Sequence, residues 1–205
     1  MTVAYNSDCM EAMAKYPDNY FQLACVDPPY GIGDFSQSDA IHKNVDWNNS
    51  IPDLIYFAEL KRVSKKRIIW GANYYNCFED GNGALVWYKN MGHKSMSQCE
   101  IASISGQQKI DYYHQNWSGG VRPKGNIHPC SKPIALYKWL LKNYAKPGDR
   151  ILDTHLGSGS SRIAAHDMGF DFVGYEIDKD YFDAQEKRFQ NHISQGNLFE
   201  PNQMY

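Results

Sequence analysis

The sequence predicts a single α/β domain built on a mainly parallel sheet that is covered by helices. Two observations carry this prediction. Apolar segments of strand length alternate along the chain with segments of helical spacing, and several of the strand-length segments are apolar almost throughout, which is typical of strands buried on both faces of a sheet. With 205 residues, of which 42% are hydrophobic and 21% charged, the chain can form one full core, so we expect one domain over residues 1–205.

Composition and charge narrow the classes of protein that remain. No segment reaches the roughly 18 consecutive apolar residues of a membrane helix, and the N-terminus lacks the pattern of a signal peptide, so we expect a cytoplasmic protein that does not enter a membrane. The five cysteines are scattered and never form a CxxC pair, which predicts neither a disulfide framework nor a metal site. A net charge of −2 argues against binding nucleic acid by bulk electrostatics alone, although residues 84–132 carry six basic and only two acidic side chains.

The first half of the chain is expected to place two buried strands and a helix around a long loop. Residues 21–26 are almost wholly apolar and predict a buried strand, and residues 68–70 predict a second one. Between them, residues 31–49 show no sustained period and are expected to form a loop, whereas residues 52–63 carry apolar side chains at helical spacing. The other elements expected before residue 132 are an edge strand at 3–5, a short helix capped by Asp8, strands at 84–88 and 100–104, and a loop at 105–127.

The second half alternates regularly between helices and strands. Lys132 begins a stretch with an apolar stripe at helical spacing, which ends near Pro147 and Gly148. The elements expected after it are a strand at 150–153, a glycine-rich turn at 157–161, a helix at 162–168, a strand at 172–176, a helix at 178–192 and a polar tail at 197–205. This alternation again indicates a mainly parallel, helix-covered sheet.

An acid, two prolines and an aromatic residue follow the first buried strand as Asp27, Pro28, Pro29 and Tyr30. Because proline lacks an N–H group and fixes φ, the chain must stop pairing there and form a stiff turn at the end of the strand. The carbonyls of the turn and the Asp27 carboxylate then form a cluster of acceptors beside the Tyr30 ring. Such a cluster suits a flat ligand with an amino group, although a solvated strand end is the commoner role for four such residues by themselves.

A second group of residues, 151–178, has the pattern of a nucleoside-binding unit. It contains a strand, a GxG turn at 157–159, a helix, a strand and the acid Glu176, which can accept hydrogen bonds from ribose hydroxyls. Two features argue against a pyrophosphate cofactor. Arg162 occupies a position where close helix–strand packing favours a small residue, and the Asp153 carboxylate repels phosphate but attracts an amino group. S-adenosylmethionine has a ribose and an ammonium and no phosphate, so we expect it as the cofactor.

Four motifs in a defined order resemble those of the DNA amino-methyltransferases, which methylate exocyclic amines of DNA bases. They are DPPY at 27–30, HPCSKP at 128–133, DTHLGSGSS at 153–161 and YEID at 175–178. Their order, with the DPPY half first and the cofactor half last, is that of the family's beta class, a circular permutation of the usual methyltransferase order. The resemblance covers most of the chain. It implies a circularly permuted Rossmann-like S-adenosylmethionine-dependent methyltransferase fold, with a mostly parallel sheet and helices on both faces.

The resemblance also implies roles for individual residues. In the catalytic turn, Asp27 and the Pro28 carbonyl accept hydrogen bonds from the target amine, Pro29 completes the stiff turn, and Tyr30 stacks on the base. The family usually has Phe at the position of His155, and a neutral imidazole can pack much as Phe does. The implied cofactor-binding residues are Lys132 for the methionine carboxylate, Asp153 for the ammonium, Glu176 for the ribose, and His155, Gly157, Ser158, Gly159 and Ile177 around them.

A site of this kind implies a site-specific DNA-methyltransferase, a class that includes the enzymes of restriction–modification systems. The family tends to pair Asp at the first motif position with adenine N6 and Ser with cytosine N4, so Asp27 favours adenine. N4-cytosine in DNA and adenine in RNA remain alternatives, as does an inactive scaffold that only binds the cofactor. A protein-glutamine methyltransferase resembles an NPPY signature instead, and a nucleotide-binding dehydrogenase is disfavoured by Arg162 and by the DPPY turn.

The region available for reading a DNA sequence is small. Residues 105–127, together with residues 31–49, are the candidate recognition segment, and Lys109, Arg122 and Lys124 are candidate contacts to DNA phosphates. So small a segment makes few contacts to base edges. We therefore expect a short recognition site, weak specificity, or help from a second copy of the chain in a homodimer.

Overall fold

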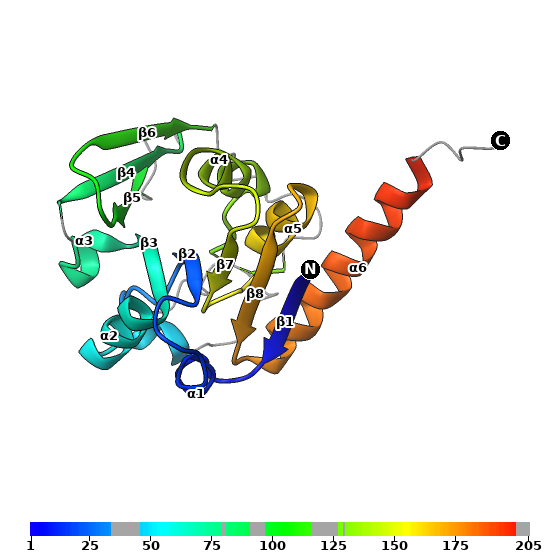
Figure 1. Cartoon of the computed structure of the whole chain (residues 1–205), viewed down its shortest axis with the longest axis horizontal. Coiled ribbons are helices and arrows are strands. Elements are labelled where there is room, and N and C mark those ends of the chain that lie inside the picture. The colour runs from blue at the N-terminus through cyan, green and yellow to red at the C-terminus, as the bar shows by residue number, and fades with distance from the viewer. Residues whose placement is uncertain (34–45, 79–80, 91–96, 116–126, 129, 200–205) are drawn as a thin grey trace.

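The structure is a computed structural model that describes residues 1–33, 46–78, 81–90, 97–115, 127–128 and 130–199. Within these residues, one eight-stranded sheet is surrounded by six α-helices (Figure 1). The strands are β1 (Thr2–Asn6), β2 (Phe21–Val26), β3 (Ser64–Trp70), β4 (Gly83–Tyr88), β5 (Cys99–Ile104), β6 (Ile110–His114), β7 (Arg150–Asp153) and β8 (Asp171–Glu176). The helices are α1 (Cys9–Met13), α2 (Leu54–Val63), α3 (Ala72–Tyr75), α4 (Ile134–Tyr144), α5 (Ser160–Asp167) and α6 (Lys179–Phe199), with a 3₁₀ helix at Asp46–Asn49.

The sheet is mostly parallel, as the sequence predicts. Its strand order is β1-β8-β7-β2-β3-β5-β4-β6, and among the described strands only β5 runs antiparallel to its neighbours, β3 and β4. The early strand β2 lies beside the late strand β7, with Leu23 opposite Ile151 and Ala24 opposite Leu152. This pairing joins the two ends of the chain into one sheet.

The strand order reverses between β2 and β7. From β2 the sheet continues through β3, whereas from β7 it continues in the other direction through β8 and β1. In open parallel sheets, ligands bind outside the carboxyl ends of the strands at such a reversal. Asp27 comes directly after β2 and Asp153 is the last residue of β7, so both acids lie at this point.

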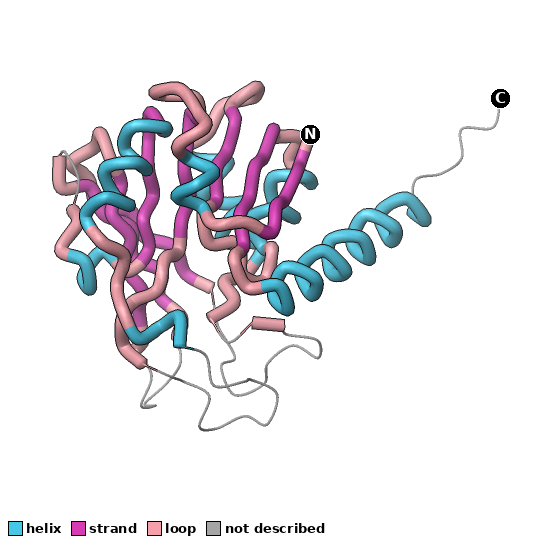
Figure 2. The backbone as a smooth tube through the Cα atoms, turned by 90° about the horizontal axis from the view of Figure 1, so that it is seen from below, coloured by secondary structure: helices cyan, strands magenta, loops and turns pink. Residues whose placement is uncertain are grey.

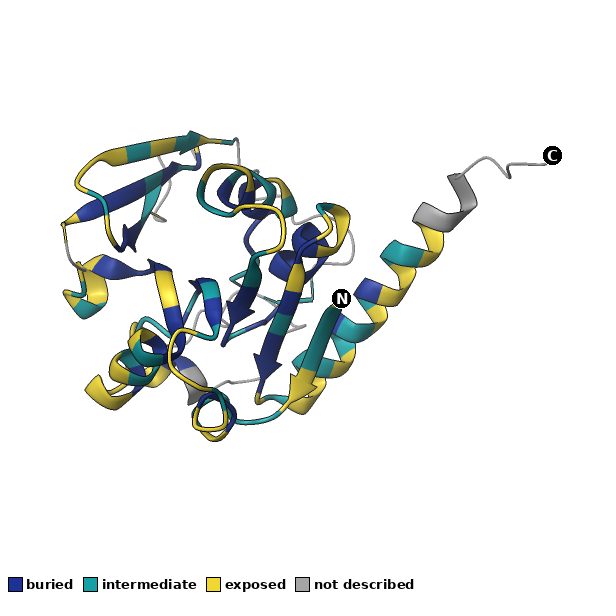
Figure 3. Ribbon diagram, viewed as in Figure 1, coloured by how far each residue is buried: buried dark blue, intermediate teal, exposed yellow. Residues whose placement is uncertain are grey.

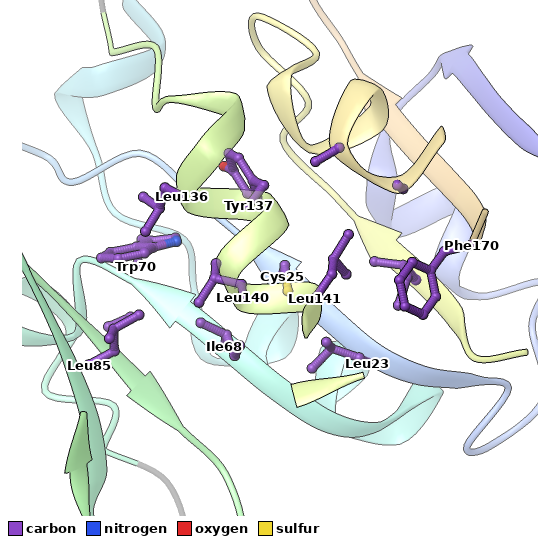
Figure 4. Close-up of a cluster of buried hydrophobic side chains, with 14 of the residues drawn as sticks. Leu23, Cys25, Ile68, Trp70, Leu85, Leu136, Tyr137, Leu140, Leu141 and Phe170 are labelled. Atoms are coloured by element: carbon purple, nitrogen blue, oxygen red, sulfur yellow. The ribbon is translucent and has the colours of Figure 1, made fainter. Parts of the chain in front are cut away.

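Helices cover both faces of the sheet because its central strands are apolar on both faces. In β2, Leu23 and Cys25 belong to a buried cluster that α4 and α5 complete (Figure 4), while Ala24 and Val26 belong to a second cluster with α1 and α2. Figure 2 shows the strands running through the middle of the molecule with helices around them. In Figure 3, β7 and β8 are mostly buried, whereas β6 has only exposed and intermediate positions.

The structure corrects three expectations about individual elements. The loop expected at 105–127 contains β6, because Ile110–His114 pair in parallel with β4 and alternate between exposed and half-buried side chains. Helix α2 begins after the capping side chain of Asp53, so the proline expected in its first turn precedes the helix. Helix α6 continues to Phe199, into the expected polar tail, of which residues 200–205 lie outside the described part.

Parts of both segments predicted to recognise the substrate also lie outside the described residues. They are residues 34–45 of the long loop and residues 116–126, which include the candidate phosphate contacts Arg122 and Lys124. Within the described ranges, no helix is both long and apolar enough to cross a bilayer.

Candidate active site

The turn after β2 is held by Asn48, a residue that the sequence does not single out. Its side-chain oxygen accepts a hydrogen bond from the backbone N–H of Tyr30 at 3.0 Å, and its side-chain nitrogen donates to the Gly33 carbonyl at 2.6 Å. Asn48 is buried, so water does not compete for these bonds. Through Asn48, the 3₁₀ helix therefore fixes the path of the chain where it leaves the sheet after Pro28 and Pro29.

Four charged side chains alternate in sign beside this turn. The Lys132 ammonium contacts Oδ2 of Asp27 and lies 3.0 Å from Oε2 of Glu100. The other Glu100 oxygen, Oε1, lies 3.1 Å from the Lys89 ammonium. The Tyr30 hydroxyl donates to Oδ1 of Asp27 at 2.6 Å, so each carboxylate oxygen of Asp27 has a partner. With all four groups charged, this cluster is electrically neutral.

Four parts of the chain supply the cluster. Asp27 follows β2, Lys89 follows β4, and Lys132 precedes α4. Glu100 lies near the start of β5, where it is the partner of Trp87 in the register with β4. Because β5 is antiparallel to β3 and β4, its first residues lie at the sheet edge where the parallel strands end. The antiparallel strand thereby adds an acid to the site.

Burial and ion pairing act differently on the two carboxylates of the cluster. Burial raises the pKa of Asp27 above its ordinary value, against the attraction of Lys132. Burial also opposes ionisation of Glu100, but Lys132 and Lys89 outweigh it and lower the pKa of Glu100. For Lys132 burial likewise opposes the charge, and the two carboxylates outweigh it and raise the pKa. Two cations therefore hold Glu100 ionised, while Asp27 has one.

Two tyrosines of α3 pack against the turn at residues 27–30. The rings of Tyr30 and Tyr74 are stacked, with centroids 4.8 Å apart and planes 18° apart. The Tyr75 hydroxyl donates to the carbonyl of Pro28 at 2.5 Å and to that of Pro29 at 2.9 Å. The Pro28 carbonyl, an expected acceptor for the target amine, is therefore bonded to Tyr75 in this structure.

Asp153, at the end of β7, is 1% exposed and accepts two hydrogen bonds from neutral groups. The His155 backbone N–H donates to Oδ1 at 3.1 Å, and the Ser161 hydroxyl donates to Oδ2 at 2.5 Å. Burial nevertheless raises the pKa of Asp153 to about 7. A cation close to this carboxyl favours its charged form, so the position is suited to an ammonium group.

The glycine turn lies against Glu176. The Gly157 N–H donates to Oε2 of Glu176 at 2.8 Å, and the Asp178 N–H donates to Oε1 at 3.0 Å. Gly157 and Gly159 have φ angles of +50° and +74°, in the left-handed region that favours glycine. Each Glu176 oxygen keeps a second lone pair for a ribose hydroxyl. Ile177, the next residue, is 65% exposed.

His155 is partly buried beside Asp153 and packs as a neutral ring. Its ring meets that of Tyr56 edge-on, with centroids 5.4 Å apart, and Nδ1 lies 3.0 Å from the Thr154 hydroxyl. The Thr154 hydroxyl is in turn 2.7 Å from the Tyr56 hydroxyl. Burial lowers the pKa of His155 to about 4, so the imidazole is uncharged at neutral pH.

Helix α6 supports the glycine turn and accommodates Arg162. The expectation that Arg162 crowds the packing of α5 on the sheet is wrong, because the side chain turns toward α6. Its guanidinium carbon lies 3.9 Å from the centre of the Phe189 ring, and Nη1 lies 2.5 Å from Glu186. From the same helix, Arg188 donates to the Ser158 carbonyl at 2.7 Å. The turn is thereby tied to α6.

Two predicted site residues lie elsewhere than expected. Lys109 precedes β6 and therefore lies at the amino ends of the parallel strands, whereas Asp27 lies at their carboxyl ends. The Lys109 ammonium pairs with Asp111 at 2.9 Å. The structure does not bring it to the site. Lys132, expected at the cofactor's methionine carboxylate, contacts Asp27 and Glu100 instead.

Comparison with known proteins identifies the family. A family model described as DNA methylase matches residues 85–187, about half of the chain. The chain belongs to this family. YubD of Escherichia coli (strain K12) is 26% identical to this DNA methylase over 88% of the chain and 87% of that protein. The type II methyltransferase M.HpaI of Haemophilus parainfluenzae is 23% identical over 92% of the chain and 74% of that protein.

Solved structures share the fold of this DNA methylase. M1.HpyAVI in complex with S-adenosylmethionine matches with a TM-score of 0.57 and 18% identity, over 92% of this chain and 100% of that one. The cytosine-N4-specific PvuII DNA methyltransferase matches with a TM-score of 0.63 and 12% identity, over 98% and 87%. These likenesses confirm the predicted fold class. Membership of the family, together with the M1.HpyAVI complex, supports S-adenosylmethionine as the cofactor.

Proposed function

We propose that this DNA methylase transfers a methyl group from S-adenosylmethionine to the N6 amine of adenine in DNA. One observation carries the proposal: Asp27 of the acceptor turn and Asp153 of the nucleoside-binding unit lie at the carboxyl ends of neighbouring strands, β2 and β7. An amine bound at Asp27 and a cofactor bound at Asp153 then share one site. The preference for adenine rests on the Asp at the first position of the DPPY motif.

The second half of the chain fits the proposed cofactor. The buried Asp153 carboxyl, which accepts hydrogen bonds from neutral donors, matches an ammonium, and the Glu176 lone pairs match the ribose hydroxyls. The 157–159 turn allows a close backbone approach, and the exposed Ile177 offers an apolar surface to the adenine ring. When bound, S-adenosylmethionine supplies a methyl group on a sulfonium, which is an electrophile.

Catalysis in this proposal consists of positioning and electrostatics. The target amine is a poor nucleophile because its lone pair is delocalised into the base, and its proton is too weakly acidic for a carboxylate to remove beforehand. Hydrogen bonds from the amine to Asp27 and the Pro28 carbonyl favour a pyramidal nitrogen and orient its lone pair for in-line attack. The proton then leaves after transfer. Both acceptors already have partners in Lys132, Tyr30 and Tyr75, and the amine has to share these oxygens with them or displace them.

The DNA substrate must present its base outside the duplex. A paired base hides its amine, so the nucleotide flips out at a cost of a few kcal/mol, which stacking on an aromatic side chain offsets. Tyr30 is the proposed stacking residue, and Tyr74 supports its ring from one face. Arg122 and Lys124 remain the proposed phosphate contacts.

The test is incubation of the protein with labelled S-adenosylmethionine and unmodified DNA, followed by digestion to nucleosides and mass spectrometry. N6-methyladenine is the expected product. N4-methylcytosine would replace the adenine assignment with the alternative target, and label found only in an RNA control would replace DNA with RNA. If the protein bound the cofactor but formed no product on either nucleic acid, the alternative of an inactive cofactor-binding scaffold would replace the proposed activity.

A further inference from the structure

Glu100 stands out among the groups that the proposed chemistry does not use. Its carboxylate lies 3.0 Å from the ammonium of Lys132 and 3.1 Å from that of Lys89, and its Oε2 is 3.4 Å from the Tyr30 hydroxyl. The Lys132 and Lys89 side chains are only 3% and 7% exposed. Glu100 therefore joins two buried cations to the catalytic turn, in the same cluster as Asp27.

The cluster as it stands competes with the role proposed for Asp27. Its Oδ1 accepts from Tyr30 and its Oδ2 contacts Lys132, so an incoming amine has to share an oxygen with one of these two partners or displace it. If Lys132 moved off Asp27 without another partner, a buried ammonium would be left unpaired, which is strongly unfavourable. Glu100 removes this difficulty because it already lies within ion-pair distance of Lys132.

We propose that Glu100 is a positioning residue that retains Lys132 when the target amine takes its place on Asp27. The inference rests on the proposed function, since it assigns Glu100 a role in the same methyl transfer. In the free protein Lys132 is shared between the two carboxylates. When the amine binds, Lys132 stays with Glu100, and Asp27 remains ionised and available as an acceptor.

The charges around Asp27 predict the direction in which the pKa of Asp27 changes when Glu100 is replaced. Lys132 favours the carboxylate form of Asp27, while the negative charge of Glu100 disfavours it. Replacing Glu100 by a neutral residue leaves Lys132 acting on Asp27 alone, which lowers the pKa of Asp27. The titratable groups that face Asp27 are Lys132, Tyr30 and Glu100, with Tyr75 of α3, Tyr137 of α4 and Asp153 of β7 beyond them.

The test compares Glu100→Gln with the wild-type protein in two measurements. In methyl transfer at saturating cofactor, we expect kcat to fall on the order of tenfold, because Lys132 now stays on Asp27. The acid limb of the pH profile of kcat should move to lower pH, and the Kd for S-adenosylmethionine should stay within about twofold. Independently of activity, carbon NMR of labelled Asp side chains should show a lower pKa for Asp27.

Two further variants separate this role from a structural one. Lys89→Met removes the other cation from Glu100 but leaves the Lys132 pair, and because it takes a positive charge out of the cluster it should not move the acid limb to lower pH as Glu100→Gln does. Glu59→Gln, which breaks an ion pair with Arg62 on the remote helix α2, controls for loss of a carboxylate. The inference is overturned if Glu100→Gln lowers kcat without moving the acid limb or the Asp27 pKa, or if Lys89→Met reproduces its effects. Wild-type protein that forms no methylated base would refute the proposed function itself.

Discussion

Asp27 and Glu176 carry different parts of the proposed reaction, so their variants should fail in different ways. Asp27→Ala removes the amine acceptor but leaves Lys132 paired with Glu100, and the fold should persist. We expect transfer to fall by about two to three orders of magnitude with cofactor affinity nearly unchanged. Glu176→Ala should chiefly raise the Kd for S-adenosylmethionine. Calorimetry and single-turnover transfer measure both quantities, and identical behaviour of the two variants would contradict this division of roles.

In the absence of cofactor, the buried Asp153 carboxylate should destabilise the folded protein, although it is the proposed contact to the ammonium of S-adenosylmethionine. The pKa of Asp153 is about 7 in the folded protein, above its unfolded value of 3.8. The free energy of unfolding is therefore highest below pH 3.8, where the carboxyl is protonated in both states, and this contribution is lost as the pH rises through 7. Asp153→Asn keeps an acceptor and removes the buried charge. At pH 8 we expect its free energy of unfolding without cofactor to rise by about 2 kcal/mol, and its affinity for S-adenosylmethionine to fall about tenfold or more.

Urea unfolding at pH 8 and at pH 4 measures the Asp153 effect, which should be much smaller at pH 4. Asp183→Asn, on the exposed surface of α6, is the matched control and should change neither stability nor affinity appreciably. A variant at Asp153 that is no more stable than wild type at pH 8 would show that the buried carboxyl is already compensated.

Among the secondary-structure elements, the junction between β3 and α3 sets the position of Tyr30. Gly71 has φ +79°, and a Cβ atom at this residue would lie 2.7 Å from Cδ1 of Tyr30 and nearer still to Cε1. Gly71→Ala should therefore displace the proposed stacking ring and lower methyl transfer by about tenfold or more, while the cofactor affinity, for which the proposed contacts lie at the ends of β7 and β8, stays within about twofold.

Gly148→Ala is the control for the Gly71 variant. Gly148 has φ +89°, and a Cβ atom there would have no other heavy atom within 4 Å beyond its chain neighbours. Both variants therefore carry the cost of a left-handed residue, roughly 1–2 kcal/mol, but only Gly71→Ala contacts Tyr30. Measurement of kcat and of the free energy of unfolding for both variants separates the two effects. Equal losses of transfer would mean that backbone strain, and not the Tyr30 ring, is responsible.

Across the molecule, the two halves of the chain should unfold together. β2 pairs with β7, and one buried cluster contains Leu23 and Trp70 from the first half and Phe172 from the last strand. All five tryptophans lie at or before residue 139, so their fluorescence reports on the part of the chain before the glycine turn. Urea transitions followed by fluorescence and by far-UV circular dichroism should coincide.

Because the two halves are expected to unfold together, S-adenosylmethionine should stabilise both of them against unfolding. Cofactor at about 100 times its Kd stabilises the folded state by about 2.7 kcal/mol, and the tryptophan transition should move by this full amount although the proposed cofactor contacts lie mostly after residue 150. The chain would unfold as two units if the fluorescence transition did not shift with cofactor, or if it did not coincide with the dichroism transition. Either result would contradict the single domain predicted from the sequence.

Local patterns in the sequence were enough to predict most elements, the fold class and the residues at the strand ends. Almost wholly apolar segments such as Phe21–Val26 mark strands buried on both faces, and glycine and acid at fixed spacing mark the turn before α5 and the end of β8. These signals are readable because the period of side chains reports the burial of each segment. The sequence did not predict β6, because none of the side chains of this edge strand is buried, even Ile110 and Tyr112 being exposed, and pairing with β4 decides that it forms.

The meeting of particular charges, in contrast, depends on the folded arrangement. Nothing local in the sequence connects Asp27 with Lys132, or Lys132 with Glu100, because these residues lie on different elements that the sheet order brings to one edge. The same holds for Asn48, which holds the turn after β2 from a distant part of a long loop. A buried ion pair depends on distances of a few ångströms between segments remote in sequence. The sequence therefore singled out Asp27 as the proposed amine acceptor, and the fold determined the partners that now hold it.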